Sequence, residues 1–183
     1  MPARLFAILR TIVVSTLFVS LWTWFAPRWM AMSKHVVLQP VLGWHLVPMI
    51  IGGAIMLRCC WDFAWTGRGT PMPLDPPRQL VITGLYRRVR NPMYLGMGLL
   101  LIGEAFLLPQ ITREMLIMTA VLFLVVNVFV MVYEEPVLRS TFGDDYERYK
   151  REVGRWVPRL SAYRSAAVPA AVDERPARRP TDR

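Results

Sequence analysis

Apolar residues gather in four long stretches of this chain, at residues 5–25, 41–61, 93–108 and 115–133, and polar segments separate them. An α-helix rises 1.5 Å per residue, so roughly twenty residues cross the hydrocarbon core of a bilayer. The third stretch is shorter than the others, and we expect it to begin within the headgroup layer. The pattern predicts an all-α integral membrane protein with about four transmembrane helices.

A different pattern follows the fourth stretch. The apolar residues there recur at helical spacing among charged ones, which is typical of an amphipathic helix on the membrane surface; they are Leu138, Phe142, Tyr146, Tyr149 and Val153. We expect Gly143 to divide this helix. From residue 161 the chain is rich in Ala, Pro and Arg, so we predict one membrane domain over residues 1–160 and a disordered basic tail over residues 161–183.

Polar residues within and between the spans give further expectations. Residues 28–39 should form a connection between the first two spans, and Glu104 should be exposed at the far membrane interface. Asn127 and Glu134 are seven residues apart and therefore share one helical face, which we expect to line a cavity.

Composition supports the membrane assignment, because 54% of the residues are hydrophobic and the mean hydropathy is +0.33. The net charge of +9 favours anionic lipid headgroups as partners, and the sequence contains no recognisable nucleic-acid-binding module. Adjacent Cys59 and Cys60 are interpreted as reduced packing residues. The only histidines, His35 and His45, lack partners at metal-ligand spacing, so no metal is expected.

Arginines lie mainly in the loop before Pro92 and in the region after Tyr133. Positive residues favour the cytoplasmic side of a membrane. With four spans, this bias predicts that both termini and the functional site are cytoplasmic. The short loops favour a bacterial inner-membrane protein.

The third stretch begins at Asn91-Pro92, a pair typical of a helix start, since Asn can cap free N–H groups and Pro suits the first helical position. The free N–H groups and the arginines before them would attract an anion. Gly96 and Gly98 leave one side of the helix bare for a flat ligand. The alternative is an ordinary positive-inside loop with glycines that let two membrane helices pack closely.

The region between residues 84 and 159 contains three blocks of glycine, aromatic and charged residues. The first contains Gly84, Tyr86, Arg90, Pro92, Tyr94 and Gly96. The second is the acid pair Glu134-Glu135, placed where an apolar helix should end, and the third combines residues 142–149 with residues 157–159. In order and spacing they resemble the isoprenylcysteine carboxyl methyltransferase and phospholipid methyltransferase group of small membrane enzymes. A histidine of that signature is Asn91 here.

The resemblance implies a methyltransferase that uses S-adenosylmethionine. It assigns catalytic roles to Arg90, Asn91 and Glu134. The implied donor-binding residues are Arg78, Gln79, Leu80, Val81, Tyr86, Asn91, Pro92, Met93, Tyr94, Gly96, Gly98, Glu134 and Glu135. The arginines and the helix start would hold the donor carboxylate, the tyrosines would pack on adenine or ribose, and Glu134 would bind the amino group or ribose hydroxyls.

The methyl acceptor stays open at this point. Asn91 replaces the histidine, and Val130 stands where the prenylcysteine enzymes are expected to carry an arginine. A carboxylate, a thiolate or a lipid amine on a lipophilic or small molecule remains possible, and the sequence does not define an oligomeric state. The alternative from another class is a non-catalytic four-helix membrane protein or assembly factor.

Overall fold

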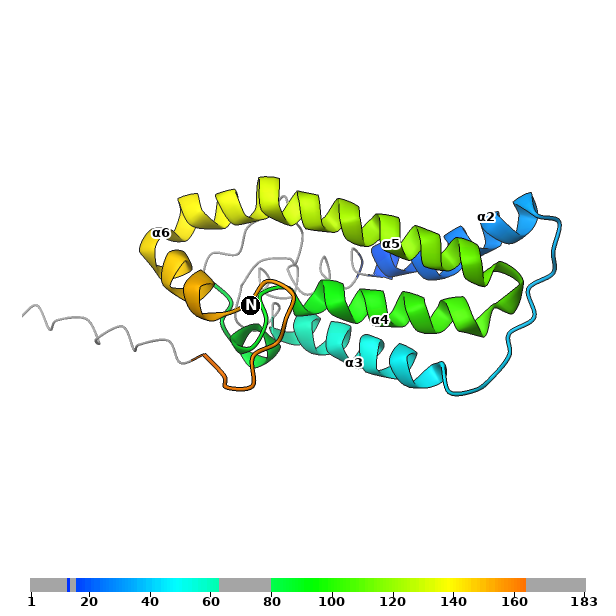
Figure 1. Ribbon diagram of the computed structural model, residues 1–183, viewed down its shortest axis with the longest axis horizontal. Helices are drawn as coiled ribbons and strands as arrows, with labels where there is room; N and C mark the ends of the chain where they lie inside the picture. The colour runs from blue at the N-terminus through cyan, green and yellow to red at the C-terminus, as the bar shows by residue number, and fades with distance from the viewer. Residues whose placement is uncertain (1–12, 14–15, 63–79, 164–183) are drawn as a thin grey trace, which may run out of the picture.

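The computed structural model describes residues 13, 16–62 and 80–163, and within these ranges the chain is helical and contains no strand (Figure 1). The elements are the π-helical turn η1 (Leu21–Phe25), α2 (Ala26–Ser33), α3 (Leu46–Asp62), the 3₁₀ turn η3 (Gly84–Arg87), α4 (Pro92–Leu107), the 3₁₀ turn η4 (Pro109–Ile111), α5 (Thr112–Phe129), the π-helical turn η5 (Val130–Glu134) and α6 (Glu135–Glu152). This part of the chain is therefore all-α, as the sequence predicts.

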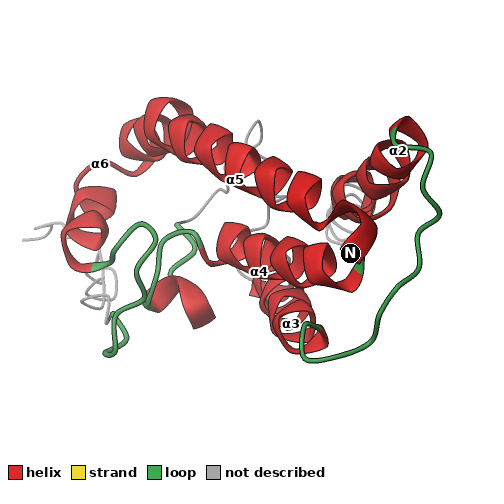
Figure 2. Cartoon of the chain, turned by 45° about the vertical axis from the view of Figure 1, so that its right-hand side comes forward, coloured by secondary structure: helices red, strands yellow, loops and turns green. Residues whose placement is uncertain are grey.

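Helix α4 lies at the centre of the molecule and packs against both α3 and α5 (Figure 2). The buried apolar side chains between these helices form the main core cluster, which contains Met56, Met97, Leu101, Ala105, Leu108, Ile111 and Met115. The outward faces are also apolar, with large exposed side chains such as Ile50, Leu57, Leu124 and Val132. An apolar exterior of this extent is typical of a surface that contacts lipid.

One helix in the described part of the chain is long and apolar enough to cross a membrane, and it runs from Pro109 to Glu152. It contains the predicted fourth span. The predicted third span is close to α4, Pro92–Leu107, which is apolar but shorter. The second corresponds to α3, which starts at Leu46 rather than at residue 41. The number of membrane crossings stays a prediction.

The first helix extends further than the sequence suggests, because α2 continues to Ser33. The expectation that a connection starts at residue 28 is therefore wrong. Pro27 lies in the first turn of α2, and the preceding turn is π-helical, with the N–H of Ala26 bonded to the carbonyl of Leu21. The wider turn accommodates the proline without ending the helix.

A π-helical turn before a proline also occurs at Glu134-Glu135. The expectation that the apolar helix ends at this acid pair is therefore wrong. Turn η5 is π-helical, the N–H of Glu135 bonds to the carbonyl of Val130, and Pro136 follows in the first turn of α6. The chain therefore stays helical from α5 into α6, as Figure 1 shows. The acid pair lies within this long helix.

Gly143 does divide the surface helix, as predicted, with φ 52° and ψ −126°. The part of α6 after Gly143 turns back toward the start of α4 (Figure 1). Its Tyr146 and Tyr149 are buried in a cluster with Val153 and Tyr163. Because Tyr163 is only 7% exposed, the expectation of disorder from residue 161 is wrong for residues 161–163; residues 164–183 lie outside the described part.

Two glycines set the spacing between α3 and α4. A Cβ added to Gly52 would lie 2.4 Å from the carbonyl oxygen of Gly96, and a Cβ on Gly96 would lie 2.8 Å from Cγ2 of Ile55. The neighbouring Gly53 has nothing within 4 Å of such a Cβ. Close backbone approach at small residues is a common way for membrane helices to associate.

These glycines give a first prediction with a control on the same helix. Gly52→Ala should lower the stability by about 1–3 kcal/mol or more, because the added methyl group meets backbone atoms of α4. Gly53→Ala should have no effect or a small stabilising one, since alanine favours helix by about 1 kcal/mol over glycine. Thermal unfolding of both variants in one detergent measures the difference. Equal effects would contradict a backbone contact at Gly52.

Candidate functional site

Helix α4 begins at Pro92, as predicted, but Asn91 does not cap it with its side chain. The side-chain amide of Asn91 instead donates to the carbonyl oxygen of Arg155 at 3.3 Å. Asn91 is buried at 6% exposure. It therefore connects the start of α4 to the C-terminal segment, residues 153–163.

Arg90 lies at the centre of a set of polar contacts. Its Nη1 is 2.8 Å from Oε1 of Glu135 and donates at 3.2 Å to the hydroxyl of Tyr146. Its Nε donates to the carbonyl oxygen of Val153 at 3.0 Å. The guanidinium thus joins the loop before α4 to α6 and to the C-terminal segment.

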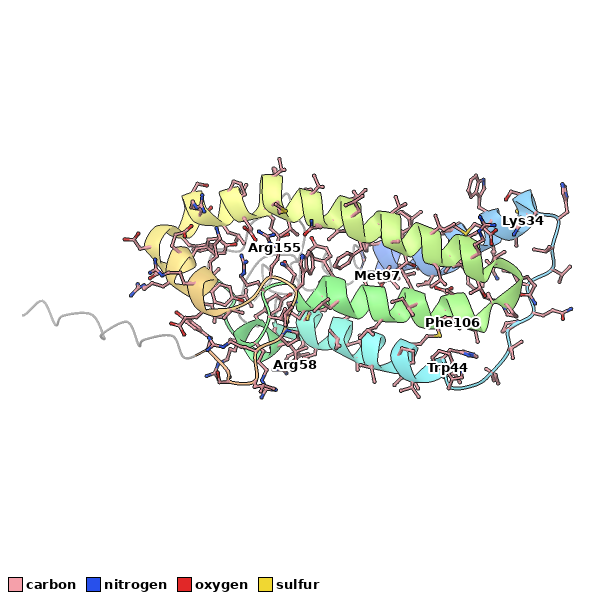
Figure 3. All side chains as sticks on the ribbon, viewed as in Figure 1. Lys34, Trp44, Arg58, Met97, Phe106 and Arg155 are labelled. Carbon is pink, nitrogen blue, oxygen red and sulfur yellow. The ribbon has the colours of Figure 1, made fainter. Side chains whose placement is uncertain are left out.

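Glu135 receives a second arginine. The Nε of Arg155 donates to Oε1 at 2.6 Å and its Nη2 to Oε2 at 3.0 Å, and Nζ of Lys150 is 3.9 Å from Oε2. Figure 3 shows Arg155 near the start of α4, at the end of the molecule opposite Lys34. Burial alone would raise the pKa of Glu135, but the Arg155 hydrogen bonds and the charge of Arg90 outweigh it and hold the pKa below its usual value of 4.5.

The C-terminal segment follows the arginine-rich loop through backbone hydrogen bonds. The N–H of Arg90 donates to the carbonyl of Gly154 at 2.9 Å, that of Arg159 to Arg88 at 2.9 Å, and that of Tyr163 to Arg87 at 2.8 Å. The two stretches run in opposite directions along this contact. The backbone of the loop is therefore fixed by the end of the described chain.

Glu134 faces a different group of residues. Its Oε2 accepts a hydrogen bond of 3.3 Å from the hydroxyl of Tyr94. The ring of Tyr94 contacts that of Trp156, with centroids 6.4 Å apart, and the Trp156 indole donates to Oδ1 of Asn127 at 2.9 Å. Asn127 and Glu134 thus lie on the side of α5 and η5 that faces α4, which agrees with their predicted common face.

A small apolar cavity of about 30 Å³ lies between Phe18, in the helical residues 16–20, and helices α4 and α5. Its walls include Tyr94, Gly98, Thr119 and Phe123, and the labelled Met97 side chain in Figure 3 marks its position between α4 and α5. A Cβ added to Gly98 would meet nothing within 4 Å. Gly98 therefore borders open space, whereas Gly96 faces α3.

The remaining predicted site residues lie apart from this cavity. Tyr86 is buried with Val81 and Cys59, and its carbonyl accepts a 2.6 Å hydrogen bond from Tyr149. Burial raises the pKa of Tyr86 well above its usual value. Met93 packs against this cluster, and Leu80 packs against the tyrosine cluster of α6. Arg78 and Gln79 lie outside the described residues.

Glu104 contradicts the expectation of exposure, since it is only 6% exposed and its Oε2 has no hydrogen-bond partner within the described ranges. Glu104 lies one turn before the end of α4, and its neighbours Leu101, Ala105 and Leu108 belong to the buried core, so this end of α4 is packed within the protein rather than exposed. The described residues contain no cluster of His, Cys, Asp and Glu that could hold a metal ion.

Sequence reasoning did not identify Arg155 and Trp156, although both contact predicted site residues. The available signal was their position just before the block at residues 157–159. A pattern along the chain does not reveal that this segment folds back over the loop before α4.

The polar contacts lead to a prediction about Glu135. Glu135→Gln should lower the stability by about 3–5 kcal/mol, because two largely buried arginine contacts lose their counter-charge. Glu147→Gln is the matched control, since it breaks an exposed pair with Arg139. We expect a large fall in melting temperature for the first variant and little change for the second.

The same carboxylate should make stability depend on pH. Its pKa is lower in the folded state than its usual 4.5, so its contribution is complete at neutral pH and is lost as the pH falls through the lowered value. The melting temperature of the unmodified protein should therefore decrease below about pH 4.5, and that of Glu135→Gln should decrease less. Parallel curves would show that Glu135 is not the group responsible.

Comparison with known proteins places these residues in a family. The model of the family described as phospholipid methyltransferase matches residues 38–145. An uncharacterized protein of Haemophilus influenzae is 49% identical over 37 residues, which are 20% of this chain and 59% of that relative. No solved structure matches. The family match covers more than half of the chain, including the loop before α4, α4 itself and Glu134-Glu135, so the chain belongs to the phospholipid methyltransferase family of membrane methyltransferases.

Proposed function

We propose that the protein transfers a methyl group from S-adenosylmethionine to a lipophilic or small acceptor. The observation that carries this proposal is the Tyr94–Glu134 pair beside the open face of Gly98, inside a chain of the phospholipid methyltransferase family. The pair and the glycine belong to the residues for which the sequence resemblance implied donor contacts.

The residues around Glu134 fit such a donor. Within the described ranges its carboxylate has the Tyr94 hydroxyl as its hydrogen-bond donor and forms no ion pair. It can therefore accept further hydrogen bonds from an amino group or from ribose hydroxyls. The bare backbone at Gly98 allows a ligand to approach α4 closely. S-adenosylmethionine supplies an electrophilic methyl group bound to a positively charged sulfur.

Arg90 and Asn91 take a different role in this proposal from the catalytic one that the resemblance implied. The guanidinium of Arg90 is occupied by Glu135, Tyr146 and the Val153 carbonyl, and the amide of Asn91 holds Arg155. Both residues therefore position the loop and the start of α4. The free N–H groups at that helix start remain suitable for a carboxylate.

Methyl transfer is an in-line displacement that depends on alignment and on exclusion of water. Tyr94, Phe123 and Trp156 supply apolar walls for this purpose. No proton relay is needed when the acceptor is already nucleophilic, which favours a carboxylate or thiolate; a lipid amine that loses its proton to water is also compatible. Replacement of the family histidine by Asn91 is consistent with such chemistry.

We place the site on the cytoplasmic side of a bacterial inner membrane, with four membrane crossings. The support is that the arginine-rich loop, Arg155 and the acid pair gather at one end of the helices. The acceptor would then reach the cavity from the bilayer. A non-catalytic member of the family is the alternative, and donor binding distinguishes the two.

Isothermal titration of the purified protein with S-adenosylmethionine tests the proposal, and Glu134→Gln extends it. We expect Glu134→Gln to weaken donor binding about tenfold or more, because a charge-assisted hydrogen bond, which contributes roughly 1.5–3 kcal/mol, is lost. Glu104→Gln, near the opposite end of α4, should leave the affinity within about twofold. No binding to the unmodified protein would reject the methyltransferase proposal, and a larger loss from Glu104→Gln would move the site.

Gly98→Leu addresses the position of the donor directly. The new side chain would enter open space, so we expect donor binding to be abolished while the melting temperature stays near normal. Gly96→Leu is the matched comparison, and it should lower the melting temperature by many degrees because it meets α3. Retained donor affinity in folded Gly98→Leu would exclude donor contact at this glycine.

A further inference from the structure

Trp156 packs against two of the aromatic side chains that line the apolar cavity, although it belongs to the C-terminal segment. Its ring lies 4.8 Å from that of Phe123 and 6.4 Å from that of Tyr94, measured between centroids, and both partners line the cavity. Tyr94 in turn bonds Glu134. Trp156 is thus next to the place where the proposed donor and the acceptor would meet.

The indole is fixed in this position from two sides. Its N–H donates to Oδ1 of Asn127 at 2.9 Å, and Asn127 is an amide in an otherwise apolar segment, where an unsatisfied polar group is costly. On either side of Trp156 the backbone is held by the Arg90–Gly154 and Arg159–Arg88 hydrogen bonds. A side chain that is held at its tip and at its backbone forms a rigid wall.

The size of the cavity limits which groups fit beside these aromatic rings. The cavity, of about 30 Å³, is small, since roughly 10–15 Å³ on this measure already holds one water molecule. A bulky group beside the reacting atom would therefore contact the indole or its partners. An unbranched group would require less displacement of these rings.

We infer that Trp156, held by Asn127, is a specificity-determining residue that excludes acceptors branched beside their nucleophilic atom. The inference rests on the proposed methyltransferase function and deepens it. The acceptor is then an unbranched lipophilic chain whose terminal carboxylate, thiolate or amine reaches the Tyr94–Glu134 pair.

The test uses linear dodecanoate, dodecanethiol and dodecylamine, each compared with a counterpart that carries an ethyl branch on the carbon next to the head group. Binding is measured in lipid nanodiscs without donor, and kcat/KM is measured with S-adenosylmethionine. The unmodified protein should prefer the linear form of at least one pair by roughly tenfold, as apolar pockets discriminate on this scale. Trp156→Ala should reduce that preference to about twofold or less.

Further variants separate this role from a purely structural one. Trp156→Phe keeps a ring but loses the hydrogen bond, and Asn127→Leu removes its acceptor, so both should reduce the preference partly even if Trp156→Ala unfolds. Trp29→Ala is the matched control, because Trp29 is 70% exposed and lies on α2. It should leave the preference unchanged.

The outcomes distinguish the two levels of the proposal. An unchanged preference in folded Trp156→Ala, Trp156→Phe and Asn127→Leu would overturn the role of Trp156. Donor binding without binding of any linear probe would overturn the acceptor assignment of the cavity. Absence of donor binding to the unmodified protein would instead reject the methyltransferase function itself.

Discussion

One carboxylate, that of Glu135, holds together three parts of the chain that are distant in sequence. Arg90 comes from the loop before α4, Arg155 from the C-terminal segment, and Glu135 itself from the long helix of α5 and α6. The side chains of Glu135 and Arg90 are only 9% and 10% exposed, so removal of one partner would leave a poorly solvated charge. The position of the loop before α4, and hence of the start of α4, depends on these contacts.

The adjacent acids therefore have different tasks. Successive residues on an α-helix point about 100° apart, so neighbouring side chains face different surroundings. Glu135 faces the arginines, while Glu134 faces Tyr94, whose side chain lines the cavity. Glu135 accepts three hydrogen bonds from arginines, whereas Glu134 accepts one from Tyr94 and keeps more capacity to accept others. This division explains how an apolar helix can contain two consecutive carboxylates.

The two glycines of α4 divide in a similar way. Gly96 meets Gly52 and Ile55 of α3, which is the packing role that the sequence offered as one alternative. Gly98, two positions later and therefore on nearly the opposite side of the helix, borders the cavity toward α5. The expectation that Gly96 and Gly98 leave the same side of the helix bare is therefore wrong, because two positions along a helix are about 200° apart. Gly96 has the packing role, and only Gly98 borders open space.

The sequence by itself determined the features that depend on local patterns. Apolar stretches predicted helices over the second and fourth spans, and Asn91-Pro92 predicted the start of α4. The sequence also predicted a division of the surface helix at Gly143, whose φ of 52° is a conformation that residues other than glycine rarely adopt. The spacing of Gly84, Tyr86, Tyr94 and Glu134-Glu135 was sufficient to indicate the family.

Only the tertiary structure decided which polar groups meet. From the sequence, Arg90 and Asn91 are equally suitable for binding a ligand and for holding a loop. They contact Glu135 and Arg155 because α6 turns back at Gly143. The helices continue through Pro27 and Pro136 because a π-helical turn precedes each. Burial of Glu104 and the position of Trp156 likewise follow from long-range packing, which no local pattern contains.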